Sequence, residues 1–129
     1  MAQYIASFAL VVADYDEAIA YYTRVLGFEL REDSPRENGK RWVLVAPPGA
    51  TTSILLAKAA NDLQATRIGD QTGGRVGFFL HTDNFERDFA AMTSRGVRFA
   101  EAPRHEDYGS VAVFEDIYGN RWDLLQPKP

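Results

Sequence analysis

Residues 5–30, IASFALVVADYDEAIAYYTRVLGFEL, contain the signals for a strand and the helix that follows it. The apolar run over residues 5–12 predicts a buried strand. Asp14 is a candidate helix N-cap, with Glu17 three residues later as in a capping box. Gly27 follows the last residue of the helical apolar pattern, where a left-handed C-terminal cap is favoured. The stretch therefore predicts a strand, a helix and a sharp stop.

The second half of the chain repeats this pattern. A shift of 69 residues superimposes the two proposed caps and the stop residue, with Asp14 on Asp83, Glu17 on Glu86 and Gly27 on Gly96. Further strands are expected over residues 28–32, 41–45 and 52–56 of the first half, and over 76–80, 97–100, 111–114 and 121–126 of the second. A helix is expected over 83–95, and polar loops over 33–40 and 103–109.

These elements predict an α+β fold made of two βαβββ modules. The modules span about residues 1–60 and 74–127, with a linker over about 61–75. Residues 61–71 of this linker could form a short helix or an arm onto a partner. We expect one domain over 1–129, because neither half could bury its own sheet face. The two curved mixed sheets are expected to enclose a cleft, and alternate strand residues would line it.

Composition excludes several classes of chemistry. The 129 residues include no cysteine and only two histidines, which excludes disulfides, thiolate nucleophiles and cysteine metal sites. The formal charge of −4 argues against a nucleic-acid partner. No stretch approaches the ~20 apolar residues of a membrane span, and the apolar start lacks a basic region and a cleavage site. We expect a cytoplasmic protein.

Two motifs resemble those of a known superfamily. They are Asp14-x-x-Glu17 with Tyr21-Tyr22 and Leu26-Gly27-Phe28, and the segment EDIYGNRWDL over residues 115–124. Together with the paired βαβββ pattern, they resemble the vicinal oxygen chelate superfamily, which comprises glyoxalase I, the bleomycin- and fosfomycin-resistance proteins and the extradiol dioxygenases. The resemblance implies the fold, a small-molecule ligand and a homodimer. The resemblance does not identify a reaction, because proteins with this fold include lyases, isomerases, transferases, dioxygenases and proteins that only bind a ligand.

The resembling enzymes hold a divalent metal ion through four strand positions. In this sequence those positions fall on Ser7, on Ile54 or Leu55, on Gly77 and on Asp123. One carboxylate and one hydroxyl do not make a stable divalent site. His81 lies on the same strand as Gly77 but ~13 Å along it, too far to substitute. We therefore expect no metal cofactor, with a rebuilt site as the alternative.

Seven residues are candidate ligand contacts. Asp123 alternates with apolar neighbours and is the best catalytic candidate, although it could equally be a satisfied carboxylate paired with Arg121 or Arg41. His81 could bind a ligand or donate to a backbone carbonyl at the strand end. Core packing is favoured for Trp42, with stacking on a planar ligand as the alternative. The seven candidates are Ser7, Arg41, Trp42, Phe79, His81, Tyr108 and Asp123.

Three hypotheses of function remain open. The first is a binder like the bleomycin-resistance proteins, which takes a planar or amphipathic molecule in an aromatic-lined cleft without a metal. The second is a lyase, isomerase or extradiol-type dioxygenase, with a rebuilt metal site or acid–base chemistry around Asp123. The third is a partner-binding domain whose cleft is filled by its own side chains. The loss of three ligand positions favours the first.

Overall fold

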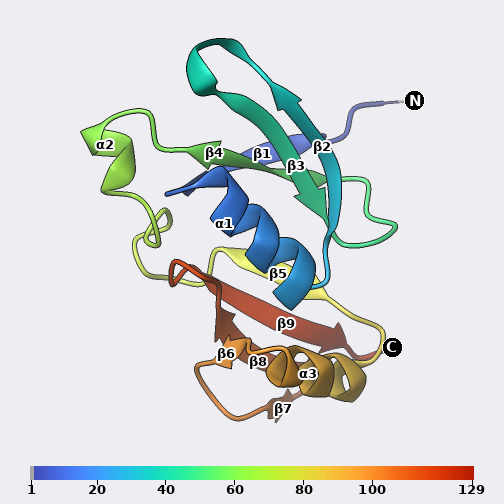
Figure 1. Cartoon of the computed structure of the whole chain (residues 1–129). Helices are drawn as coiled ribbons and strands as arrows, with labels where there is room; N and C mark the ends of the chain where they lie inside the picture. Colours follow the sequence, from blue (N-terminus) through green and yellow to red (C-terminus); the bar gives the residue numbers. More distant parts are fainter. Residues whose placement is uncertain (1) are drawn as a thin grey trace. The chain divides into compact units, whose positions relative to one another are not determined.

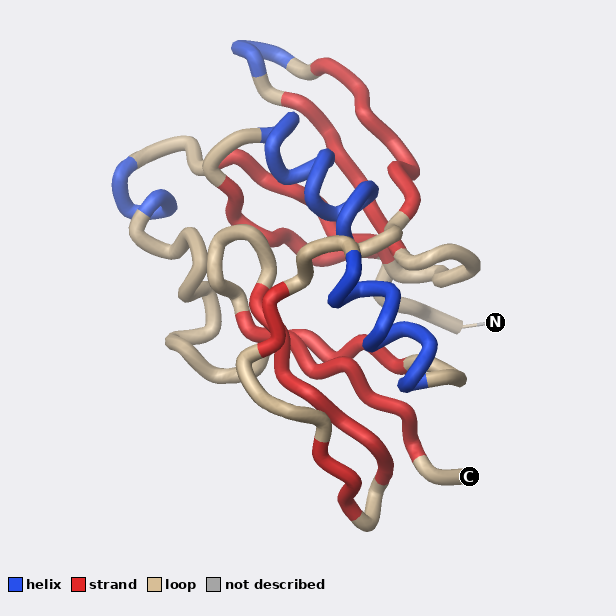
Figure 2. The backbone as a smooth tube through the Cα atoms, turned by 60° about the horizontal axis from the view of Figure 1, so that its bottom comes forward, coloured by secondary structure: helices blue, strands red, loops and turns tan. Residues whose placement is uncertain are grey.

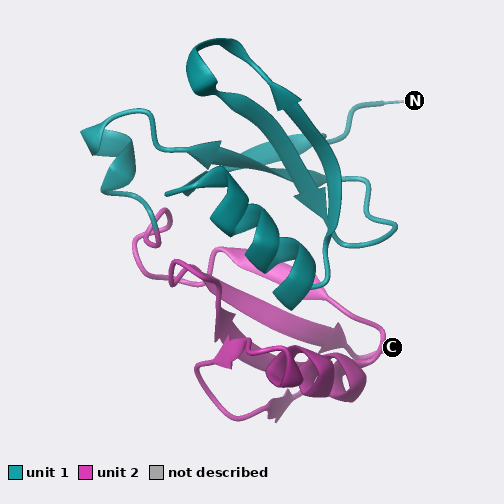
Figure 3. Cartoon of the chain, viewed as in Figure 1, with its two compact units in different colours: residues 1–68 teal, residues 69–129 magenta. Residues whose placement is uncertain are grey.

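The computed structural model describes residues 2–129, and the chain forms two compact units, residues 1–68 and 69–129 (Figure 3). The boundary lies inside the 61–75 segment. Unit 1 contains β1 (Ser7–Val12), α1 (Tyr15–Ala20), a π-helical turn η1 (Tyr21–Val25), β2 (Glu29–Pro35), a 3₁₀ turn η2 (Glu37–Gly39), β3 (Arg41–Ala46), β4 (Ser53–Lys58) and α2 (Asp62–Ala65) (Figure 1). Unit 2 contains β5 (Phe78–His81), α3 (Phe85–Ser94), β6 (Arg98–Phe99), β7 (Arg104–Glu106), β8 (Gly109–Glu115) and β9 (Arg121–Pro127).

The two units repeat one sheet topology. Unit 1 has the strand order β1-β4-β3-β2, and unit 2 has the order β5-β9-β8-β6, with β7 paired to β8. In each unit the first strand runs parallel to the last, and the other pairs are antiparallel. Figure 2 shows the helices and strands of both repeats. The α+β fold with two βαβββ modules is therefore confirmed.

The helix caps agree with the sequence in the first unit and differ in the second. The Asp14 carboxylate accepts the backbone N–H of Glu17 at 2.8 Å, as a capping residue should. In α3 the cap is Asn84, whose Oδ1 accepts from the Arg87 N–H, so the prediction of Asp83 was wrong by one residue. Thr82 explains the shift, because its hydroxyl accepts the N–H of Asn84 and fixes the entry into the helix.

A π-helical turn accounts for the unequal spacing of cap and stop. Gly27 follows Asp14 by 13 positions, whereas Gly96 follows Asn84 by 12. The turn Tyr21–Val25 absorbs one extra residue, since the Leu26 N–H donates to the Tyr21 carbonyl five residues back at 3.1 Å. Gly27 and Gly96 both have positive φ, 82° and 97°, as a left-handed helix stop requires.

Each sheet buries one face under its helix. In unit 1 the largest fully buried side chains are aliphatic strand residues and Tyr22 of the π turn. In unit 2 the core is a run of aromatic rings, each within 6 Å of the next. The run comprises Phe85, Phe89, Phe99, Phe114, Trp122 and Phe78. The apolar stripe of the second helix therefore serves the core, and each large buried side chain contributes about 1.5–3 kcal/mol.

Three segments depart from the expected elements. The predicted loop over 33–40 is partly strand, because β2 continues to Pro35 opposite Arg41. The predicted loop over 103–109 contains β7, which pairs with β8 although its residues are polar. A polar strand of this kind has no alternation of apolar and polar residues from which it could be predicted, because backbone hydrogen bonds rather than apolar burial keep it in the sheet. Within 61–75, α2 is a short helix, one of the two alternatives left open for this segment. No helix among residues 2–129 is long and apolar enough to cross a bilayer.

Candidate functional site

The sheet of unit 2 exposes an aromatic ring on the face opposite α3. Phe78 stacks on Trp122 in the core with ring centroids 4.8 Å apart, so its neighbour Phe79 points to the other face. Phe79 is 57% exposed and lies opposite Asp123 in the strand register. Register partners share a face. We call this surface the open face of unit 2, defined by Phe79, His81, Asp123, Arg104 and Glu101.

Asp123 is the carboxylate at the centre of the open face. Its Oδ1 is buried and has no hydrogen-bond partner among residues 2–129. Neither expected ion pair forms, because Arg121 lies near Glu115 and Arg41 pairs with Asp16 and Asp33. Burial raises the pKa of Asp123, nearby Arg104 opposes that rise, and the Glu101 charge adds to it. A carboxyl with a raised pKa and an unused oxygen is able to bind a donor group of a ligand.

An ion-paired cluster borders Asp123. Arg104 Nε lies 3.1 Å from both oxygens of Glu101, and Glu101 Oε2 accepts the backbone N–H of Val113 at 2.9 Å. Arg104 Nη1 also approaches the Tyr108 hydroxyl at 3.5 Å. Tyr108 lies in the turn between β7 and β8 and is more than half exposed. The surface of unit 2 therefore presents one guanidinium, one phenol and two carboxylates close together. They belong to Arg104, Tyr108, Glu101 and Asp123.

The two histidines are both exposed. His81 ends β5 opposite Leu125, on the same face as Phe79, and none of its ring atoms has a hydrogen bond recorded within residues 2–129. His105 Nδ1 lies 2.9 Å from the Ser110 hydroxyl. His81 is therefore available to a ligand on the open face, whereas the ring of His105 is engaged.

In unit 1 the predicted contacts fall on both faces of the sheet. Ser7 pairs in register with Ser53, and Leu55, two residues on, pairs with Leu44. Ser7 and Trp42 therefore share the face away from α1. Arg41 lies on the helix face, where its guanidinium is 2.9 Å from Asp16 and 2.7 Å from Asp33. Its charge is already balanced by these two carboxylates, so Arg41 holds Asp16 and Asp33 in place at the start of β3.

Trp42 borders a hollow at the end of this sheet. Strands β3 and β4 pair with each other only at Leu44–Leu55 and Val45–Ile54, so the start of β3 and the end of β4 do not pair with each other, although β3 still pairs with β2 there and β4 with β1. A pocket of about 430 Å³ lies there, lined by Trp42, Tyr15, Lys40 and Lys58 among others. The indole is 38% exposed, so the expectation of core packing for Trp42 was wrong. Because the start of β3 and the end of β4 do not pair with each other, the ring lies open to the hollow.

The residues at the expected metal positions do not fit a metal ion. Ser7 faces Ser53, the fourth-strand position on the same face is the apolar Leu55, and Phe79 and Val113 flank Asp123 in the register. Thr72 occupies the space that a side chain at Gly77 would need. Residues 2–129 contain no group of three His, Cys, Asp or Glu able to hold a metal.

The second sequence motif has a structural role. Asp116 is buried, and its Oδ1 accepts the backbone N–H groups of Tyr118 and Asn120, both at 2.9 Å. Its Oδ2 accepts the Asn120 side-chain amide at 2.9 Å. The carboxylate thus fixes the turn between β8 and β9, and with it the register that presents Asp123.

A family comparison accounts for both motifs and the repeated topology. The family model described as Glyoxalase/Bleomycin resistance protein/Dioxygenase superfamily matches residues 4–124. The chain belongs to this superfamily. Among its relatives is an uncharacterized protein of Shewanella frigidimarina (strain NCIMB 400), 54% identical over 98% of this chain and 95% of that protein.

Several solved structures share the fold. TnmS3, an antibiotic binding protein from Streptomyces sp. CB03234, is 32% identical, covers 98% of each chain and has a TM-score of 0.80. UcmS2 is 28% identical with a TM-score of 0.83, over 97% of this chain and 98% of its own. The superfamily includes binding proteins as well as enzymes, so the site chemistry decides between the two.

Sequence reasoning missed several of the residues that these sites contain. Glu101 and Arg104 lie in segments without hydrophobic alternation, and only the charge pattern could have suggested their pairing. Tyr15 and Lys58 come from the start of a helix and the end of a strand, 43 positions apart. Only the three-dimensional fold brings such residues to one hollow.

Proposed function

We propose that this superfamily member binds a small planar or amphipathic organic molecule, and that it does so without a metal ion. The observation that carries the proposal is the exposed ring of Phe79 beside Asp123, whose buried Oδ1 has no hydrogen-bond partner in the part of the chain that the structure describes. Aromatic stacking and one well-placed acceptor are typical of pockets that orient an aromatic ligand. The similarity to TnmS3, described as an antibiotic binding protein, supports binding as the activity.

The test is titration with bleomycin and a panel of planar aromatic antibiotics, followed by thermal shift and calorimetry. We expect at least one compound to raise the melting temperature, and Phe79→Ala and Asp123→Asn to weaken its binding. Leu63→Ala removes a similarly exposed apolar side chain and serves as the matched control. Failure of every compound to bind, or equal binding by Phe79→Ala and wild type, would contradict the proposal.

The second candidate function is acid–base catalysis centred on Asp123, as in a lyase or isomerase. It is favoured by the raised pKa of Asp123, since a carboxyl that is protonated over a wider pH range can exchange a proton with a substrate. Metal analysis of protein purified without chelators separates the metal-free proposals from a dioxygenase-type site. A stoichiometric ion would overturn the metal-free assignment.

We also propose that the protein acts as a cytoplasmic homodimer. The support is a group of exposed apolar side chains near the start of β1: Phe8 is 42% exposed, and Ile5 and Tyr4 are each 69% exposed. Exposed apolar patches commonly mark the contact with a partner. The acidic composition supports a small molecule rather than a nucleic acid as the ligand.

A further inference from the structure

The hollow at the end of the unit 1 sheet gathers positive charge in an acidic chain. Arg36, Lys40, Arg41 and Lys58 line it, and no Asp or Glu does. The chain has only three lysines, so two of them lie at this one pocket. A net charge of −4 makes this concentration of cations unexpected on composition alone.

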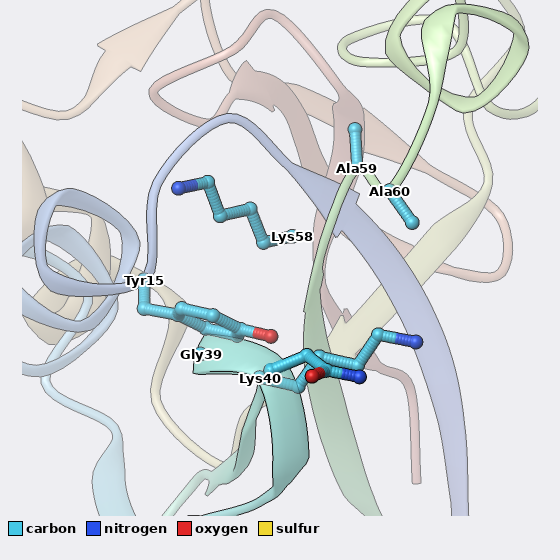
Figure 4. Close-up of a pocket in the computed structure, with 7 residues that line it drawn as sticks. Tyr15, Gly39, Lys40, Lys58, Ala59 and Ala60 are labelled. Atoms are coloured by element: carbon cyan, nitrogen blue, oxygen red, sulfur yellow. The ribbon is translucent and has the colours of Figure 1, made fainter.

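The two lysines differ from the two arginines in having uncompensated charge. Arg41 is held by Asp33 and Asp16, and Arg36 lies 3.6 Å from Glu32 with its guanidinium 5.8 Å from the centre of the Trp42 ring. Neither lysine ammonium has a carboxylate within 4 Å in the described chain. Figure 4 shows both lysine side chains beside Tyr15 at a second pocket that shares these residues with the hollow, with their nitrogens pointing in different directions. Their flexible four-carbon stems allow either ammonium to turn toward an anion.

Tyr15 adds a hydrogen-bond donor at the same place. The ring is 8% exposed, and its oxygen accepts the backbone N–H of Arg41 at 3.2 Å. The phenol proton has no acceptor recorded within residues 2–129. A phenol oriented in this way by a backbone donor can give its own proton to a ligand oxygen.

Apolar groups complete the hollow. Trp42 is partly exposed, and Leu55 and Ala57 share its face of the sheet. The volume of about 430 Å³ lies within the range of small-molecule sites. We propose that this hollow binds an aromatic anion, with its ring against Trp42 and its charged end near Lys40, Lys58 and the Tyr15 hydroxyl. The inference goes beyond the proposed function, because every residue it uses belongs to unit 1.

The probe is 2-naphthoate, with 2-naphthalenemethanol as the neutral ring control and acetate as the ringless control. Calorimetry and the two indole N–H signals in proton–nitrogen spectra report binding, and Trp42→Phe assigns the signals. We expect 2-naphthoate to bind about tenfold or more tightly than either control and to shift the Trp42 signal rather than that of Trp122. No binding of 2-naphthoate at millimolar concentration, or equal binding of the alcohol, would overturn the proposal.

The variants test the residues. Lys40→Gln with Lys58→Gln should weaken 2-naphthoate binding by about tenfold or more, because charge-assisted hydrogen bonds to the anion are lost. Lys128→Gln makes the same charge change at the third lysine, in unit 2, and should leave the affinity unchanged. All three lysines are exposed, and thermal unfolding verifies that the variants fold. Asp123→Asn separates this proposal from the proposed function, because it should leave the affinity for 2-naphthoate unchanged. Loss of 2-naphthoate binding in Asp123→Asn, with binding retained in the double lysine variant, would refute this site.

Discussion

Two aspartates of this chain have pKa values shifted in opposite directions, for different physical reasons. Asp33 accepts two hydrogen bonds from Arg41, and this interaction lowers its pKa despite some desolvation. Asp123 has burial as its main perturbation, and its pKa is raised. A carboxyl whose pKa is lowered by folding stabilises the fold at pH values above the ordinary pKa of aspartate. A carboxyl whose pKa is raised by folding reduces stability at those pH values.

We therefore expect opposite pH dependences for the two Asn variants. Asp123→Asn removes a carboxylate whose ionisation opposes folding, so its urea midpoint should exceed that of wild type at neutral pH. Asp33→Asn removes a favourable ion pair, so its midpoint should fall below wild type at neutral pH. Both differences should shrink as the pH falls through the aspartate range, because wild-type carboxyls then become protonated. A lower midpoint for Asp123→Asn at neutral pH would contradict the assignment.

Asp116 has a structural role that can be separated from ligand binding. Asp116→Ala leaves two backbone N–H groups and the Asn120 amide without their acceptor, so we expect the free energy of unfolding to fall by about 2–3 kcal/mol. Urea denaturation measures this loss. Asp107→Ala, at an exposed aspartate of the same unit, should change stability by less than about 0.5 kcal/mol. Equal effects of the two substitutions would refute the role assigned to the turn.

At the scale of elements, the sequence predicted what apolar periodicity and capping encode. The helix stops at Gly27 and Gly96 and the opposite orientations of Phe78 and Phe79 follow directly from those patterns. The cap at Asn84 and the polar strand β7 did not, because hydrogen bonds to Thr82 and to β8 decide them. The lack of pairing between the start of β3 and the end of β4 leaves no mark in the sequence, so the hollow beside Trp42 could not be predicted.

Gly77 illustrates a close approach of two segments. A Cβ atom at this position would collide with Thr72, whose hydroxyl donates to the Arg75 carbonyl at 2.7 Å and so cannot move freely. Gly77→Ala should lower the free energy of unfolding by about 1–3 kcal/mol, as overpacking does. The same substitution in a Thr72→Ala background should cost less, because a methyl and a hydroxyl have been removed. A double-mutant cycle measures the coupling, and additive effects would argue against this contact.

At the scale of the whole molecule, the fold is far better specified than the activity. The duplicated pattern and the EDIYGNRWDL segment identify the superfamily, because they encode caps, stops and the Asp116 turn. The ligand depends instead on a few exposed side chains, such as Phe79 and Trp42, whose chemistry is compatible with many compounds. Asp123 was predictable as a site candidate, whereas its neighbours Glu101 and Arg104 required the structure.

The proposed homodimer has a direct test. Sedimentation equilibrium should give twice the chain mass of 14.4 kDa. Phe8→Asp introduces a charge on β1 and should shift the mass toward one chain, since a buried unpaired carboxylate opposes association. Leu63→Asp is the control at an exposed residue of α2. A wild-type mass of one chain would exclude the dimer.

The distribution of charge around the unit 1 hollow also affects how fast a ligand arrives. Setting aside Lys40 and Lys58, the two lining cations with uncompensated charge, leaves the rest of a chain of net charge −4 with a formal charge of −6. An approaching anion is repelled by most of the surface and attracted at one mouth, so the field selects the direction of approach before any contact forms. Added salt weakens both effects, because its ions screen charges beyond about 8–10 Å. The association rate of an anionic ligand would therefore report the balance between this local attraction and the general repulsion.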